Sequence, residues 1–125
     1  RLVDVDLFKL VNDRFGHAVG DRVLAALAQM LRENTRGSDL VARIGGEEFL
    51  LVLPDAPPAD ALEVCERLRA RVAAHDWSVL APGLTVTLSL GLAHAPDYAA
   101  QPLFERADAA MYRAKHLGRN RVETA

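Results

Sequence analysis

At 125 residues the chain has the size of one domain, which can bury a hydrophobic core without disulfides or structural metals. Half of the residues are apolar and 26% are charged, a balance that is typical of globular proteins and excludes disordered and fibrous classes. Fifteen basic residues against 17 acidic ones leave a formal net charge of −2, so we expect no nucleic-acid partner, because no broad positive field is present.

Neither a disulfide nor a membrane segment is expected. Cys65 is the single cysteine, so it cannot form an internal bridge, and a buried reduced thiol fits a cytoplasmic protein. The longest apolar stretches, such as residues 49–53, are too short to cross a bilayer, and no signal peptide opens the chain, so we expect no membrane contact. Because the chain starts inside a strand-like segment at Arg1, we expect one domain over residues 1–125 whose N-terminal portion is missing.

The first third of the chain predicts a strand and two helices. Residues 2–5 are typical of the end of a strand, and Asp6 is suited to cap the helix that follows. Gly16 is expected to end this helix, and a second helix is expected to begin near Gly20 and Asp21. The first helix carries the apolar residues Phe8, Leu10, Val11 and Phe15, and in the second helix the apolar residues that recur on one face are Val23, Leu27, Met30 and Leu31.

Two apolar segments around a pair of glycines predict a hairpin. Residues 40–44 and 49–53 are strand-like and flank Gly45-Gly46-Glu47-Glu48. Pro54 and Asp55 are expected to close the second strand.

The rest of the chain predicts two helices separated by a strand. Pro57-Pro58 precedes one helix, residues 84–92 alternate like a strand with one buried side, and residues 102–116 form the last helix. The inward residues of the helices are Ala61, Cys65, Leu68 and Val72, then Leu103, Ala107, Ala110, Met111 and Ala114. This interleaving of helices and strands indicates an α/β sandwich in which helices cover one mixed sheet.

Carboxylates gather at two turns of the predicted chain. Asp4 and Asp6 stand where the first strand ends, and Glu47 and Glu48 stand at the hairpin tip. If these elements are neighbours in the sheet, Asp4 and Glu47 can form an acidic site that binds a hard cation such as magnesium, which shares its coordination with substrate phosphates. Taken one by one, Asp6 is more simply a helix cap, and the glycine pair with its glutamates is more simply a solvated turn.

The ordered set of motifs resembles the GGDEF family of diguanylate cyclases. The match spans almost the whole chain, and its signature loop has glutamate at the third position. Its segments are Asp4-Val5-Asp6-Leu7-Phe8-Lys9-Leu10-Val11-Asn12-Asp13, Phe15-Gly16-His17, Gly20-Asp21, Arg43-Ile44-Gly45-Gly46-Glu47-Glu48-Phe49, Ala107-Asp108, Met111-Tyr112, Ala114-Lys115 and Gly118-Arg119-Asn120. The resemblance implies an α+β, palm-like nucleotidyl-cyclase fold with a largely antiparallel sheet, and an enzyme that joins two GTP molecules into cyclic di-GMP.

The resemblance implies a metal-assisted catalytic centre. Asp4, the backbone carbonyl of Val5, and Glu47 are implied to hold Mg²⁺, with Mn²⁺ as an alternative ion. Glu47 is also the candidate base for the ribose 3′-hydroxyl, and Glu48 is implied to assist with a second metal ion. Lys9 is implied to stabilise the transition state, although without the family match it would be an exposed helix lysine.

The resemblance also implies a GTP-binding set. Asn12 and Asp21 are implied to recognise guanine, because a carboxylate accepts from donors that adenine lacks; Asp21 also suits the first turn of a helix. The remaining implied substrate contacts are Phe8, His17, Gly45, Gly46, Lys115 and Arg119. Of these, Lys115 and Arg119 would neutralise the β- and γ-phosphates, and His17, Lys115 and Arg119 would also be ordinary residues near helix ends.

Arg36 and Asp39 stand before the signature loop at the spacing of the family's RxxD inhibitory site, and Arg67 resembles a secondary contact for the same ligand. The resemblance therefore implies product inhibition by cyclic di-GMP. It also implies a catalytic homodimer with one GTP per protomer, and an N-terminal sensory or dimerisation domain in the full protein.

Three alternatives to a cyclase remain to be weighed. The strongest is an inactive GGDEF-like module that binds cyclic di-GMP through Arg36 and Asp39. A more distant one is another palm-type nucleotidyl transferase that uses ATP. A serine or cysteine hydrolase is disfavoured, because no nucleophile-elbow pattern or Cys-His pairing is present.

Overall fold

The computed structural model describes residues 2–37, 39–54, 56–94 and 100–125, and the side chains of residues 2–4, 100 and 101 lie outside this description. Within it, five strands form one sheet in the order β2-β3-β1-β4-β5. The strands are β1 (Leu2–Val5), β2 (Leu40–Arg43), β3 (Glu48–Val52), β4 (Leu88–Leu92) and β5 (Arg121–Thr124). The β2-β3, β3-β1 and β1-β4 pairs are antiparallel and β4-β5 is parallel, so the predicted α+β fold with a mixed, largely antiparallel sheet is confirmed.

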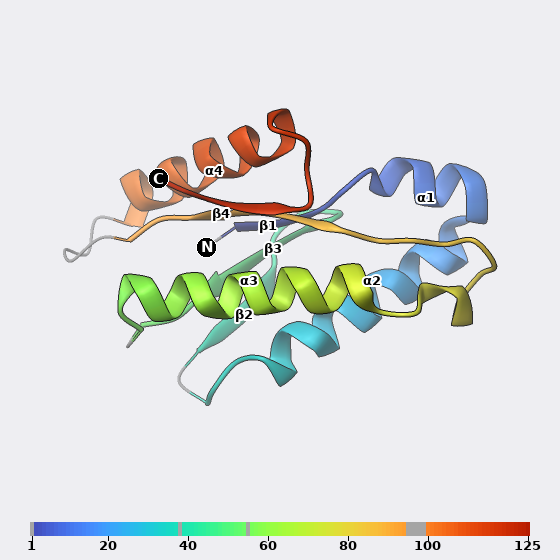
Figure 1. The fold of residues 1–125 in the computed structure, drawn as a ribbon, viewed down its shortest axis with the longest axis horizontal. Coiled ribbons are helices and arrows are strands. Elements are labelled where there is room, and N and C mark those ends of the chain that lie inside the picture. Colours follow the sequence, from blue (N-terminus) through green and yellow to red (C-terminus); the bar gives the residue numbers. More distant parts are fainter. Residues whose placement is uncertain (1, 38, 55, 95–99) are drawn as a thin grey trace.

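Helices cover both faces of the sheet (Figure 1). Helix α4 (Ala100–His116) lies on one face, while α2 (His17–Glu33) and α3 (Pro58–Ala74) lie on the other. Helix α1 (Phe8–Phe15) extends beyond the end of the strands and packs on α2. None of the described helices combines the length and apolar character that a membrane span requires.

The topology brings several chain turns to one end of the sheet. Because β1 is antiparallel to β3 and β4, the end of β1 lies beside the beginnings of those two strands. Because β4 and β5 are parallel, the beginning of β5 lies at the same end. The segments before β3, β4 and β5 therefore gather around the end of β1, next to α1.

Helix positions follow the predicted apolar faces, with one boundary wrong. Ala61, Cys65, Leu68 and Val72 are all buried in α3, as their spacing predicts. Helix α2 begins at His17 rather than near Gly20, because Gly16 with φ +90° ends α1 and lets the chain enter the next helix at once.

The prediction of one buried side for residues 84–92 holds over residues 84–87, where Leu84 and Val86 are buried and Thr85 is exposed, but is wrong for residues 88–92. The regular strand is limited to β4, all five of whose residues are buried because helices cover both sides of it. Ser89 is 0% exposed, and a Cβ on Gly91 would overlap the Ala107 carbonyl oxygen and the Met111 amide nitrogen of α4. The small residues that alternate with the leucines therefore allow α4 to approach the sheet closely.

A short 3₁₀ helix, η1 (Trp77–Val79), follows α3 and was not predicted. Trp77 is 2% exposed, and its indole N–H donates to the carbonyl oxygen of Val72 at 2.8 Å. The hydroxyl and backbone N–H of Ser78 donate to Asp76 and hold the pKa of that carboxyl below its usual value. These contacts anchor the connection between α3 and β4.

Candidate active site

The two acidic segments meet at the end of β1. In the β1-β3 register, Asp4 is paired with Glu48, and the backbone N–H of Val5 donates to the carbonyl oxygen of Glu47 at 3.2 Å. The main chains of the first strand and the signature turn are therefore direct neighbours, as the acidic-site hypothesis requires. The side chain of Asp4 lies outside the described residues.

The signature turn spans residues 44–47 and is braced by Arg43. The N–H of Ile44 donates to the carbonyl oxygen of Glu48 at 3.0 Å, which closes the turn. The Arg43 guanidinium donates to the carbonyl oxygens of Gly45 and Gly46, with the shortest of these bonds, from Nη2 to Gly46, at 2.7 Å. This bracing was not predicted, because the sequence shows no signal for side-chain contacts within the turn.

The two glycines of the turn are not required by the fold. Neither has a positive φ, a Cβ on Gly46 would meet nothing within 4 Å, and one on Gly45 would lie in ordinary contact with Glu48 at 3.5 Å. Glycine at these two positions is therefore better explained by a ligand that approaches the turn closely than by the needs of the fold.

Replacing Gly46 with alanine is expected to separate folding from turnover. The free energy of unfolding should stay the same or rise by about 0.4–1 kcal/mol, because the turn accepts a Cβ and the unfolded chain loses freedom. The turnover that the family resemblance implies should fall at least ~10-fold, because the added methyl group would occupy the approach to the turn. Turnover and urea unfolding should be measured on the same sample. Unchanged turnover in Gly46→Ala would show that the turn does not need glycine to let a ligand approach.

The predicted guanine-binding residues lie on α1 and α2. Asn12 Oδ1 is buried and accepts no hydrogen bond from the described residues, and it faces Gly20, where any Cβ would overlap it. Asp21 is exposed and lines a hollow of about 500 Å³ between α2 and the hairpin, together with Arg43 and Phe49. The structure thus places one unpaired acceptor and one exposed carboxylate on neighbouring helices.

The remaining predicted residues of these helices differ in exposure. Lys9 is exposed on α1, and the exposed His17 lies just beyond the Gly16 C-cap of α1, as predicted, and is also the first residue of α2. Phe8 is only 7% exposed and packs in the core, with its ring 3.2 Å from the position that a Cβ on Gly20 would take. Phe8 thus holds α1 against α2 and offers little surface to a ligand.

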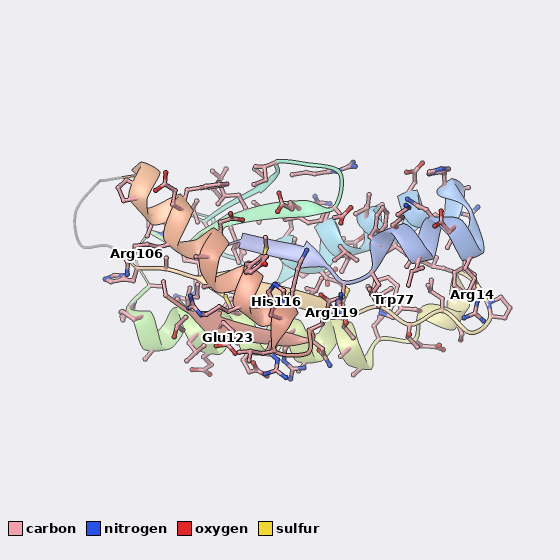
Figure 2. All side chains as sticks on the ribbon, turned by 90° about the horizontal axis from the view of Figure 1, so that it is seen from above. Arg14, Trp77, Arg106, His116, Arg119 and Glu123 are labelled. Atoms are coloured by element: carbon pink, nitrogen blue, oxygen red, sulfur yellow. The ribbon has the colours of Figure 1, made fainter. Side chains whose placement is uncertain are left out.

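Two predicted cations lie at the C-terminal end of α4. Lys115 is half-buried in its last turn, and Arg119 is exposed in the turn that leads to β5 (Figure 2). Arg119 lines a hollow of about 460 Å³ together with Asp6, Leu7 and Thr87. Positive charge therefore lies near the end of β1, although it comes from more than 100 residues further along the chain.

The three residues of the predicted inhibitory site lie together, away from this end of the sheet. Arg36, Asp39 and Arg67 line one hollow of about 420 Å³ between the segment before β2 and helix α3. The Arg36 N–H donates to Asp39 Oδ2 at 2.8 Å, and the Asp39 N–H donates to the Arg36 carbonyl at 2.9 Å, which fixes the RxxD turn. Asp60 and Glu63 line the same hollow, so its charge is mixed.

The donors at the acidic corner fit a hard cation only in part. Among residues with described side chains, no three histidine, cysteine, aspartate or glutamate residues converge as a metal site. Glu47 and Glu48 are half-buried carboxylates next to Val5, and carboxylate and carbonyl oxygens are the ligands that Mg²⁺ prefers. Asp4, on the neighbouring strand, would supply a further carboxylate, so the donor types available at this corner are those that Mg²⁺ takes.

The prediction that Asp6 caps the following helix is wrong. Leu7 holds the N-cap position of α1 with φ +53°, and no side chain caps the helix. The Asp6 carboxylate is instead buried and accepts hydrogen bonds from Thr87, Ser89 and Asn120. The alternation of hydroxyls with leucines after residue 84 is the sequence signal that could have indicated partners for a buried acid.

Comparisons with known proteins agree with this arrangement. The family model described as "Diguanylate cyclase, GGDEF domain" matches residues 2–121. The diguanylate cyclase DgcM of Escherichia coli (strain K12) is 49% identical over 125 residues, which cover 99% of this chain and 30% of that protein. The diguanylate cyclase DgcP of Pseudomonas aeruginosa is 44% identical over 99% of this chain and 19% of its own length. The chain thus spans less than a third of the length of these curated relatives.

Solved structures show the same fold. The active GGEEF domain of a diguanylate cyclase from Vibrio cholerae matches with a TM-score of 0.90 and 35% identity over 98% of this chain and 79% of that one. The GGDEF domain of DgcB from Caulobacter crescentus, solved in complex with c-di-GMP, matches with a TM-score of 0.90 and 33% identity over 98% and 74% of the two chains. By sequence and by structure, the chain belongs to the GGDEF-domain family of diguanylate cyclases.

Proposed function

We propose that this domain is a diguanylate cyclase that condenses two GTP molecules into cyclic di-GMP and releases two pyrophosphates. In each half of the reaction, a ribose 3′-hydroxyl loses its proton and attacks the α-phosphate of the other GTP, so that a phosphodiester bond forms and the bond to pyrophosphate breaks. The observation that carries this proposal is the hydrogen bond from Val5 to Glu47, because it sets the acidic signature turn beside the end of β1.

At this corner, Asp4, the Val5 carbonyl and Glu47 would hold Mg²⁺, with Mn²⁺ as the alternative ion. When bound, such an ion lowers the pKa of the attacking hydroxyl, offsets charge on the α-phosphate and favours departure of pyrophosphate. Glu47 would take the hydroxyl proton, and Glu48 would support a second ion.

The helices would bind the nucleotide. Asp21 would accept from the guanine N1–H and amine, and Asn12 would be a second contact to the same base. Lys9, exposed on α1, would place a compact positive charge at the reacting phosphate, while Lys115 and Arg119 would contact the β- and γ-phosphates. His17, at the start of α2, would be a further contact.

Each protomer would bring one GTP, so the active species would be a homodimer with two sites face to face. Further segments of the full protein would bring the protomers together. An artificially dimerised form of the protein is therefore the best material for an activity assay.

Incubating this dimerised protein with GTP and Mg²⁺, and separating the nucleotides by chromatography, tests the proposal. Cyclic di-GMP and pyrophosphate are the expected products, and ATP should give no cyclic product. If no product forms from GTP while the protein still binds cyclic di-GMP, the receptor alternative holds instead. That alternative is favoured by the hollow that unites Arg36, Asp39 and Arg67.

Replacing Arg36 with alanine is expected to relieve product inhibition. The guanidinium lines the hollow with Asp39 and Arg67, and loss of hydrogen bonds from a charged group should raise the half-inhibitory concentration of cyclic di-GMP at least ~10-fold. The rate without added product should stay the same. As a control, Arg106→Ala removes an arginine that donates to the His94 carbonyl elsewhere on the molecule and should leave inhibition unaltered. Equal inhibition curves for Arg36→Ala and the unaltered protein would show that the RxxD motif is only a surface turn and does not bind cyclic di-GMP.

A further inference from the structure

Asp6 is a buried carboxylate that the proposed chemistry does not use. It follows β1 directly and is 6% exposed. Its Oδ2 accepts hydrogen bonds from Thr87 Oγ1 at 2.7 Å and from the backbone N–H of Asn120 at 3.0 Å, and its Oδ1 accepts from Ser89 Oγ at 2.5 Å. A buried carboxylate is unfavourable unless donors surround it, so Asp6 and its three donors hold one another in place.

The turn between α4 and β5 needs outside support, because its backbone conformation is unfavourable. Gly118, Arg119 and Asn120 have φ angles of +121°, +64° and +45°. Residues with side chains rarely adopt a positive φ, and two in succession persist only where the surrounding structure holds them.

Among the hydrogen bonds of this turn, three join Arg119 and Asn120 to α4, to α3 and to the residue that follows β1. The Arg119 N–H donates to the Ala114 carbonyl of α4 at 2.9 Å, and Arg69 of α3 donates to Asn120 Oδ1 at 2.9 Å. The third bond, from the Asn120 N–H to Asp6, joins residues that are 114 positions apart. Of the three, it is the bond that ties the turn to the end of β1.

We propose that Asp6 is a positioning residue for the substrate triphosphate. Through the N–H of Asn120, it fixes the turn that carries Arg119, and so sets where the β- and γ-phosphates lie relative to the α-phosphate at the acidic corner. Arg119 follows α4 in Figure 2 and lines the same hollow as Asp6 and Thr87. The inference rests on the proposed function, because it assigns the phosphate contact to Arg119.

A direct role for Asp6 at the cation is the competing explanation. Both Asp6 oxygens are already engaged by three donors, which leaves the carboxylate poorly placed as a ligand. The substitution Asp6→Asn separates the two roles. Its amide oxygen can still accept from Thr87 and Asn120, and its amide nitrogen can donate to Ser89 Oγ, whereas the negative charge is lost.

The test measures binding of 3′-deoxy-GTP and 3′-deoxy-GMP by calorimetry in the presence of Mg²⁺. Neither compound has the attacking hydroxyl, so binding is read without turnover. Asp6→Ala is expected to raise the Kd of the triphosphate at least ~10-fold and to change that of the monophosphate by less than about twofold. Asp6→Asn should leave both constants within about threefold of the unaltered protein. Asp76→Ala, which removes another hydrogen-bonded aspartate, the N-cap of η1, is the control and should change neither constant.

Amide hydrogen exchange gives a second readout that needs no nucleotide. The Asn120 amide should exchange at least ~10-fold faster in Asp6→Ala than in the unaltered protein, and should remain protected in Asp6→Asn. Equal weakening of both nucleotides by Asp6→Ala would indicate a general structural defect and would overturn the proposal. So would loss of triphosphate binding in Asp6→Asn with a protected Asn120 amide, because the charge would then be the essential feature. If the unaltered protein binds the triphosphate but forms no cyclic di-GMP, the proposed function fails while these comparisons still decide the role of Asp6.

Discussion

Replacing Glu47 with glutamine is expected to lower the rate of cyclic di-GMP formation at least ~10³-fold, because one change removes both a base and an anionic ligand. Folding should persist, with the free energy of unfolding altered by less than about 1 kcal/mol, since Glu47 is only half-buried and its backbone carbonyl still accepts from Val5. The measurement is product formation at saturating GTP over a range of Mg²⁺ concentrations, together with urea unfolding.

The Mg²⁺ series separates the two roles of Glu47. If the residue acts chiefly as a metal ligand, high Mg²⁺ should restore part of the rate, whereas loss of the base should persist at every concentration. Glu105→Gln is the matched control, because Glu105 is exposed near the other end of α4, and it should leave the rate unchanged. Full activity of Glu47→Gln would show that this residue is neither the base nor an essential metal ligand, and the proposed catalytic site beside the end of β1 would then be wrong.

Replacing Gly91 with alanine is expected to be the most destabilising glycine-to-alanine change among the described glycines. The new Cβ would overlap the Ala107 carbonyl oxygen and the Met111 amide nitrogen, and would lie 2.9 Å from Met111 Cβ. Backbone atoms of a helix cannot move aside as a flexible side chain can, so α4 must shift away from β4. We expect a loss of about 3 kcal/mol or more, which for a chain of this size lowers Tm by roughly 10 °C.

Thermal unfolding of Gly91→Ala beside Gly46→Ala checks this expectation. The two changes are chemically identical, but the second places its methyl group where nothing lies within 4 Å. Gly91→Ala should therefore lose stability, while Gly46→Ala should lose activity alone. A Tm for Gly91→Ala within about 2 °C of the unaltered protein would mean that α4 does not pack on β4 as closely as described.

Helices were predicted well because their evidence is local. The spacing of Ala61, Cys65, Leu68 and Val72 defines one face within a few turns, and all four are buried. Strand β5 was missed, because Arg121–Thr124 is half-buried at the sheet edge and lacks an apolar pattern. The burial of β4 on both sides could not be inferred from its own residues, since it depends on helices from distant parts of the chain.

The sequence predicted which residues belong to the candidate site, but not how they are arranged in space. The family resemblance placed Glu47 at the catalytic corner and Arg119 at the phosphates, and the fold brings both to the same end of the sheet. The roles of Arg43 and Asp6 were missed, because one braces a turn through carbonyl oxygens and the other finds its partners 81 to 114 positions away. The hydroxyls of Thr87 and Ser89 hint at a buried acceptor, but nothing in the residues around Asp6 says that it is the partner.

By itself, the sequence determined which side chains could carry the chemistry and where most helices and strands lie, since periodicity and motif spacing are properties of short segments. Only the tertiary structure decided that Val5 lies against Glu47, that α4 packs directly on β4, and that Asp6 holds the turn before β5. The physical reason is that strand pairing and buried hydrogen bonds join residues far apart in the chain, and each of these contacts exists only when the whole sheet has formed.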